Sequence, residues 1–143
     1  MPHPVRITLF GVEDANRVAA EIRPELVRLA RVKREFDQLQ SRIAVQSVAV
    51  AGASPENPDV RDLKALVDRR DLLAGEITMG VQAVQRRGCL LKDLDRGLVD
   101  FYALSGDRLV FLCWHMGEAE VAHWHTLESG FAGRQPLQGS ELE

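Results

Sequence analysis

The spacing of hydrophobic positions changes once along this chain, from a helical period to a period of two. In the first part, apolar residues recur every three or four positions, as at Val18 and Ile22, which is the period of an α-helix. A stretch rich in Pro, Gly and Ser at residues 51–58 interrupts the pattern. We therefore predict two helices, over about 12–50 and about 59–87, that form a long antiparallel hairpin.

After Gly88 the apolar residues alternate with polar ones, which is typical of β-strands. The short loops between these runs predict an antiparallel β-meander. The runs that we expect to be strands are residues 89–94, 98–104, 109–114 and 121–125. A weaker alternation at residues 5–10 predicts one more short strand before the first helix.

Together these patterns predict an α+β fold, in which the small C-terminal meander packs against the helical hairpin. The length of 143 residues fits one ordinary domain, so we expect residues 1–143 to form a single domain. The hairpin would occupy about 12–87 and the meander about 89–125, and a tail would follow at 126–143. In the tail, Phe131 and Leu137 are possible anchors.

The predicted hairpin leaves apolar residues beside its single seam, among them Leu66, Val67, Leu72 and Ala74. A homodimer that forms a four-helix bundle would bury them, so we expect a homodimer. Pro24 lies within the first helical pattern, where it either kinks one helix or starts a second one.

Charge and composition narrow the expected partners and location. The net charge of -3 gives no long-range field that would attract nucleic acid. The N-terminus lacks the pattern of a signal peptide and no apolar run is long enough to span a membrane. We therefore expect a soluble cytoplasmic protein with neither nucleic acid nor membrane as a partner. Cys89 and Cys113 lie far apart in the sequence, which favours free thiols over a disulfide.

The residues suited to chemistry gather between positions 113 and 125. This segment holds one of the two cysteines, both tryptophans and three of the four histidines. A two-residue turn at Gly106 and Asp107 would place Asp100 opposite Cys113. A three-residue loop at 117–119 would place Cys113 opposite His123, with His125 one diagonal away on the same face. The opposite face would carry Trp114 and Trp124, which we expect to pack against the helices.

This arrangement predicts a candidate metal site. Cys113, His123 and His125, with either Asp100 or His115, would supply the sulfur, nitrogen and oxygen ligands that suit zinc or another transition metal. In one alternative, the histidines only form hydrogen bonds at the surface. In another, a neighbouring imidazole activates the Cys113 thiol as a nucleophile.

Two further residues could support such a site. Glu118 could act as a general acid or base or as an additional ligand, although a glutamate in a turn is more often simply exposed to solvent. Arg134 could hold an anion or a carboxylate of a neighbouring subunit, and the alternative is a flexible tail with one salt bridge. The chain has no glycine-rich phosphate loop and no Cys-x-x-Cys pair, so nothing indicates nucleotide chemistry.

Several motifs between Phe10 and Leu137 carry a family resemblance. They are Glu-Asp-Ala-Asn at 13–16, Lys-Asp-Leu-Asp-Arg-Gly-Leu-Val-Asp-Phe at 92–101, Leu-Cys-Trp at 112–114, Gly-Glu at 117–118, Trp-His at 124–125 and Gly-Phe-Ala-Gly-Arg-Gln-Pro at 130–136. On these motifs the chain resembles an uncharacterised bacterial family, the domain of unknown function numbered 2203. Because that family has no established activity, the resemblance implies a soluble prokaryotic protein and no particular reaction.

The resemblance also bears on the ligand set. It implies that relatives share the residue types at Asp100, Cys113 and His125, whereas the position of His115 typically holds Arg and that of His123 commonly holds an aromatic residue or another residue that is not His. A site with three histidines would then be peculiar to this chain. The resemblance therefore favours the smaller set of Asp100, Cys113 and His125.

Two functions follow from the sequence. The first is an uncharacterised protein that binds a metal ion or a small ligand on the face of the meander. The second is a homodimeric structural or adaptor protein that acts through its helical surface and has no ligand site. A thiol-dependent or metal-dependent enzyme is a third interpretation, and the sequence names neither a cofactor nor a reaction.

Overall fold

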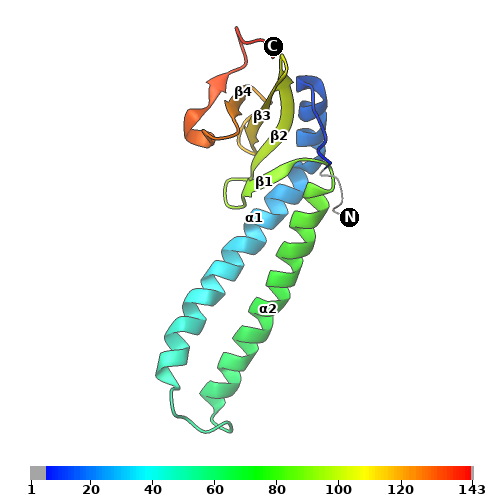
Figure 1. Ribbon diagram of the computed structural model, residues 1–143. Coiled ribbons are helices and arrows are strands. Elements are labelled where there is room, and N and C mark those ends of the chain that lie inside the picture. The colour runs from blue at the N-terminus through cyan, green and yellow to red at the C-terminus, as the bar shows by residue number, and fades with distance from the viewer. Residues whose placement is uncertain (1–5, 143) are drawn as a thin grey trace, which may run out of the picture.

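Two long antiparallel helices dominate the computed structural model, which describes residues 6–142 (Figure 1). Helix α1 spans Val12–Ala49 and helix α2 spans Pro58–Gln85. The helical hairpin predicted from the hydrophobic spacing is thus confirmed. Helix α1 continues through Pro24 as one helix. Helix α2 begins after Asn57, whose side chain accepts a hydrogen bond from the backbone N–H of Asp59 at 2.8 Å, a typical N-terminal cap.

The hairpin extends far beyond the sheet. At 1.5 Å per residue, α1 is about 57 Å long. Figure 1 shows the sheet at one end of the hairpin and the loop between the helices at the other. The half of the hairpin beyond the sheet has only a small core of its own. That core consists of Val32, Leu39 and Leu73, with Phe36, Leu66 and Ile77 packed against it.

The C-terminal half forms one five-stranded antiparallel sheet with the strands in chain order. The strands are β1 (Leu90–Asp93), β2 (Leu98–Ser105), β3 (Arg108–His115), β4 (His123–Thr126) and β5 (Gln135–Pro136). The predicted meander is therefore present, and the α+β fold class is confirmed. The sheet gains β5 because the predicted tail turns back after the short 3-10 helix η1 (Phe131–Gly133) and pairs with β4.

The predicted strand at residues 5–10 is not formed. Residues 6–11 have no strand structure, and Val5 lies outside the described residues. The backbone N–H of Phe10 donates one hydrogen bond of 2.7 Å to the carbonyl oxygen of Tyr102 in β2. Strand β1 already pairs with the same edge of β2 up to Asp100. The segment before α1 can therefore reach only the part of this edge beyond Asp100, where Tyr102 lies.

One face of the sheet packs against the first turns of α1. Val110, Leu112 and Trp114 of β3 are fully buried there against helical residues such as Val18 and Ile22. Trp124 of β4 is partly buried and packs against the same core. The inner face predicted from alternation is therefore correct. The other face, which we call the outer face, carries the polar residues of the candidate site.

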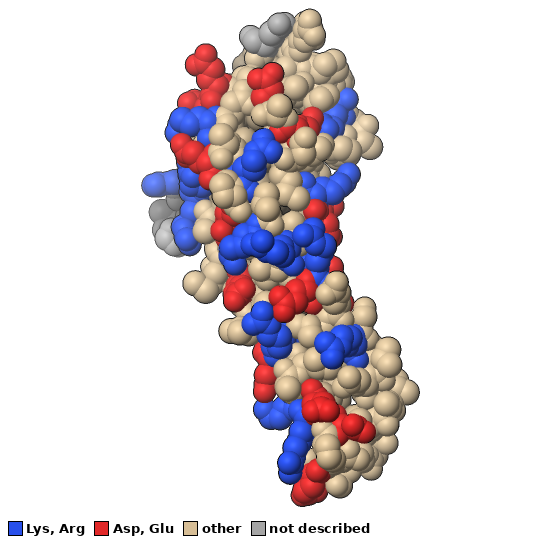
Figure 2. All heavy atoms as spheres, turned by 180° about the vertical axis from the view of Figure 1, so that it is seen from behind, with Lys and Arg blue, Asp and Glu red and all other residues tan. Residues whose placement is uncertain are grey.

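Charged residues are interspersed over the molecule. Figure 2 shows basic and acidic side chains side by side along the helices, as expected for a net charge of -3. Among residues 6–142, no helix is both long and apolar enough to cross a lipid bilayer. Cys89 and Cys113 are both free thiols, and both are buried.

Candidate functional site

The predicted strand register is the register of the sheet, although the second connection is longer than the predicted three-residue loop, since β3 ends at His115 and β4 begins at His123. Asp100 of β2 lies opposite Cys113 of β3, and Cys113 lies opposite His123 of β4. His125 pairs with Phe111, one diagonal away from Cys113. Because side chains alternate between faces, Asp100, Cys113, His123 and His125 all belong to the outer face.

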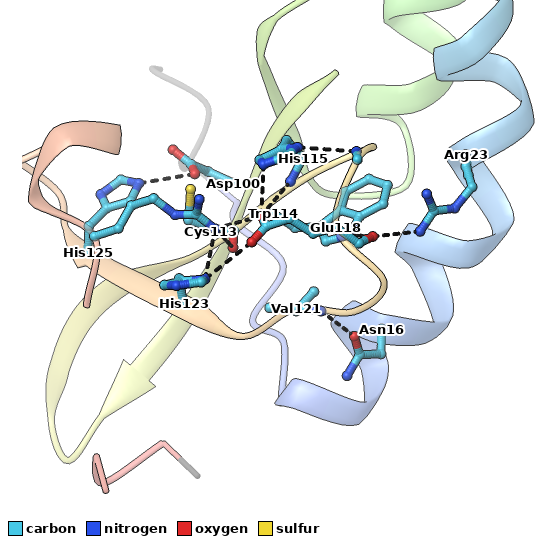
Figure 3. A network of polar contacts seen from close by, with 12 residues as sticks. Asn16, Arg23, Asp100, Cys113, Trp114, His115, Glu118, Val121, His123 and His125 are labelled. Atoms are coloured by element: carbon cyan, nitrogen blue, oxygen red, sulfur yellow. Dashed lines mark hydrogen bonds and ion pairs between the residues drawn. The ribbon is translucent and has the colours of Figure 1, made fainter. Parts of the chain in front are cut away.

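Three of these side chains converge. One ligand-type atom each of Asp100, Cys113 and His125 lies within 4.8 Å of the other two. Figure 3 shows the three side chains pointing toward one another from three adjacent strands. All three residues are buried, with exposures of 3%, 0% and 2%. His125 Nε2 lies 3.1 Å from Asp100 Oδ1.

The hydrogen bonds of His125 determine which ring nitrogen carries its proton. Nδ1 lies 2.7 Å from the carbonyl oxygen of Thr126. A carbonyl oxygen can only accept, so Nδ1 must donate and carry the hydrogen. In a neutral imidazole the other nitrogen, Nε2, then has a lone pair, and this lone pair faces the carboxylate of Asp100. Two acceptors at 3.1 Å require a proton or a metal ion between them.

The environment of Cys113 keeps its thiol protonated in the absence of a metal. Burial raises the pKa of Cys113 to about 12, and the negative charge of Asp100 acts in the same direction, whereas Arg134 acts in the opposite direction. A catalytic thiol normally has a lowered pKa and some exposure. In a thiol-histidine-carboxylate triad, the carboxylate and the nucleophile bind different ring nitrogens. Here Asp100 bonds the ring nitrogen on the thiol side and a backbone carbonyl binds the other, so the geometry does not fit a thiol nucleophile.

His115 and His123 belong to a separate polar cluster centred on Glu118 and Arg134. Arg134 Nη2 donates to Glu118 Oε1 at 2.6 Å and to His123 Nδ1 at 3.0 Å. His115 Nε2 lies 3.6 Å from Glu118 Oε1. Glu118 is thus held within the protein rather than exposed in a solvated turn. The structure does not bring His115 or His123 into the group formed by Asp100, Cys113 and His125.

Arg134 was expected to bind an anion or a carboxylate of another subunit. Its partner in the structure is a carboxylate of the same chain, Glu118. The same Nη2 atom also donates to the carbonyl oxygen of Cys113 at 3.4 Å. Arg134 therefore connects the Glu118 cluster with the backbone of the Cys113 strand.

Two residues of α1 that the sequence did not single out for the site hold the loop between β3 and β4. Arg23 donates to the carbonyl oxygens of Met116 and Glu118, the latter at 2.8 Å, and its guanidinium lies 5.1 Å from the centroid of the Trp114 ring. Asn16 Oδ1 accepts a hydrogen bond from the backbone N–H of Val121 at 2.7 Å. The hydrophobic periodicity of the sequence does not mark Arg23 as a residue of the site. Asn16 could have been noticed, because it lies in one of the motifs of the family resemblance.

Fold and site together define an α+β protein with a buried carboxylate, thiol and imidazole on the outer face of a small sheet. Residues 8–137 match the family described as uncharacterized conserved protein (DUF2203). This match covers most of the chain, so the protein belongs to that family, as the motifs predicted. No curated protein and no solved structure matches the chain. The family description names no activity, and the function has to be argued from the residues.

Proposed function

We propose that this protein binds one transition-metal ion, preferentially zinc, through Asp100, Cys113 and His125. The orientation of His125 carries the proposal. In the neutral imidazole, the hydrogen bond from Nδ1 to the Thr126 carbonyl leaves the lone pair of Nε2 directed at Asp100. Histidines that bind metals usually donate their other ring N–H to a carbonyl or a carboxylate in this way.

The donor set suits zinc in both chemistry and spacing. A thiolate, an imidazole and a carboxylate are all common zinc ligands. In a tetrahedral site with nitrogen and oxygen ligands about 2.0 Å from the ion, those two atoms are about 3.3 Å apart. The 3.1 Å between His125 Nε2 and Asp100 Oδ1 is close to that spacing. Three protein ligands leave a fourth position for water or another small ligand.

The charges of the site also favour a divalent ion. Asp100 and an ionised Cys113 would place two negative charges in a buried environment, which is costly without compensation. A divalent cation balances both charges. Without a metal, the raised pKa of Cys113 keeps one of the two groups neutral.

Elemental analysis of protein purified without a histidine tag tests this proposal. We expect about one metal ion per chain in the wild type and a large loss in Cys113→Ser and His125→Ala. The matched control is His123→Ala, which removes an imidazole from the same face but outside the proposed ligand set. Folding of each variant is checked by circular dichroism. Less than about a tenth of an equivalent in the wild type, after zinc is supplied and excess removed, would refute the proposal.

We also propose that the protein forms a homodimer through its hairpin and resides in the cytoplasm. The supporting observation for the dimer is the small core of the hairpin beyond the sheet, together with apolar side chains that face solvent, such as Val48 at 80% exposure and Met79 at 71%. A second copy could cover such residues in a helical bundle. Buried free thiols suit a reducing compartment.

Sedimentation analysis over a range of protein concentrations tests the dimer. We expect the mass of two chains, and we expect Met79→Lys to shift the equilibrium toward the monomer by placing a charge in the interface. Lys64→Gln, an exposed change elsewhere on α2, is the control. A wild-type mass of one chain at every concentration would contradict the dimer and leave the metal proposal unaffected.

A further inference from the structure

Residues 127–137, which we call the strap, follow β4 and include η1 and β5. The strap begins with a tight turn, in which the backbone N–H of Ser129 donates to Thr126 Oγ1 at 3.2 Å. It continues through η1 and β5. It ends where the backbone N–H of Leu137 donates to the carbonyl oxygen of Ala122 at 2.9 Å. The strap starts two residues after His125, one of the three converging side chains.

Phe131 and Arg134 of the strap lie on the outer face of the sheet, whereas Leu137 at its end is buried in the core on the helical side. The ring of Phe131 lies between the guanidinium groups of Arg96 and Arg134, at 4.6 Å and 4.7 Å from its centroid, and 6.4 Å from the ring of His115. Arg134 bonds the Cys113 carbonyl and His123. The strap therefore covers the side of Cys113 that faces His115.

Aromatic side chains of the sheet cover the opposite side. Phe111 contacts the ring of His125, with centroids 5.4 Å apart, and Tyr102 contacts Phe111 at 4.7 Å. Between these aromatic residues and the strap, Asp100, Cys113 and His125 are almost completely shielded from solvent. The outer face of a sheet of this kind is open to water unless another segment covers it. An ion or a reagent in solution therefore needs a movement of the protein to reach the three side chains.

Few side chains of the strap are buried. Leu137 is its one buried side chain. The closed arrangement also leaves Arg134 Nε buried with no hydrogen-bond partner among the described residues. An unpaired buried donor is unfavourable, and it regains hydrogen bonds to water when the segment opens. Segments with few buried contacts open at a lower free-energy cost than the whole fold.

We propose that the strap is a gate that opens to admit and release the ligand of the Asp100, Cys113 and His125 site, with Arg134 as its latch. The role in metal exchange rests on the proposed metal binding. The proposed opening of the strap does not depend on metal binding, because the solvent accessibility of Cys113 measures the opening in the metal-free protein. Cys89 provides an internal control, since it is equally buried but lies in the core on the helical side.

The test is alkylation of both thiols in the intact metal-free protein by a small reagent, followed by mass spectrometry of the separate peptides. In Arg134→Gln we expect the rate at Cys113 to rise by about tenfold or more, with the rate at Cys89 unchanged. Gly133→Ala is a second variant with the same expectation, because an added Cβ would lie 2.5 Å from Ser129 Cβ within the strap and would force the strap to change its path. Arg108→Gln, at the exposed first residue of β3, is the control and should label like the wild type.

Two results would overturn the gate. One is an unchanged rate at Cys113 in both strap variants. The other is an equal rise at Cys89 and Cys113, which would mean that the whole fold loosens. In zinc-loaded protein, we expect a chelator in excess to remove the ion faster from the strap variants than from the wild type at equal starting occupancy. If the wild type takes up no metal at all, the metal proposal fails, and the labelling result still decides whether the strap opens.

Discussion

At the scale of single residues, Cys113 determines what the candidate site can do. Its thiol is fully buried, and burial together with Asp100 raises its pKa to about 12. The thiol is therefore neutral near pH 7 unless a cation replaces its proton. A metal thiolate is compatible with these surroundings, whereas a free reactive thiolate is not.

The first prediction concerns the stability of the metal-free protein at alkaline pH. The pKa values of Cys89 and Cys113 rise from the ordinary thiol value of 9.0 to about 11 and about 12 in the folded protein. As the pH rises above 9, the thiols ionise first in the unfolded chain, so the free energy of unfolding falls between pH 9 and about 12. We expect a loss of up to about 1.4 kcal/mol per pH unit for each thiol.

Urea denaturation at about pH 8 and about pH 10 measures this loss. The Cys113→Ala variant should be less stable than the wild type at the lower pH but should lose less stability between the two pH values. If variant and wild type show the same change with pH, the raised pKa of Cys113 is contradicted.

The second prediction is that metal binding releases protons. A metal ion at the site must displace the proton of the Cys113 thiol near pH 7, and it also replaces the proton between His125 Nε2 and Asp100 Oδ1, so we expect the release of about two protons. Calorimetric titration with zinc in buffers of different ionisation enthalpy measures the number released. Cys89→Ser should release the same number as the wild type. Binding without proton release would show that Cys113 is not a thiolate ligand.

At the scale of secondary-structure elements, the close contact of α1 and α2 depends on Gly80. A Cβ atom at this position would lie 2.4 Å from Leu29 Cδ2 and 2.9 Å from Glu25 Oε1 in the facing helix. We therefore predict that Gly80→Ala lowers the free energy of unfolding by about 1–3 kcal/mol through overpacking.

Gly75 provides a matched control in the same helix. A Cβ atom there would meet nothing within 4 Å, and alanine favours the helix. Gly75→Ala should therefore raise the stability by about 0.4–1 kcal/mol. Chemical denaturation of both variants measures the difference, and equal effects of the two substitutions would contradict the close packing at Gly80.

The elements also show what the sequence could and could not predict about the site. The alternation of apolar and polar residues indicated the correct strand register. A slip by one residue would turn the apolar side chains away from the helices, so only one register buries them. The sequence did not indicate in which direction each histidine side chain points. His123 is directly opposite Cys113, yet it turns toward Arg134, whereas the diagonal His125 meets Asp100. The direction of His123 depends on Arg134 of the strap, a segment whose irregular path has no periodic sequence pattern.

At the scale of the whole molecule, the proposed ion would join β2, β3 and β4 at the end of the molecule where the sheet packs against the hairpin. An ion that binds only the folded state stabilises it, by about 2.7 kcal/mol at a free concentration about one hundred times the Kd. We predict that zinc raises the Tm of the wild type and of His123→Ala but has little effect on His125→Ala. Thermal denaturation with and without zinc measures this, and an equal shift in all three proteins would indicate nonspecific binding.

The central claim is that one metal ion is bound by the thiolate of Cys113, the imidazole of His125 and the carboxylate of Asp100. X-ray absorption spectroscopy of zinc-loaded protein without a histidine tag tests it most directly, because it identifies the atoms around the ion. We predict one sulfur at about 2.3 Å and nitrogen or oxygen ligands at about 2.0–2.2 Å, with the sulfur absent in Cys113→Ser. A wild-type spectrum with nitrogen and oxygen ligands alone would contradict the account.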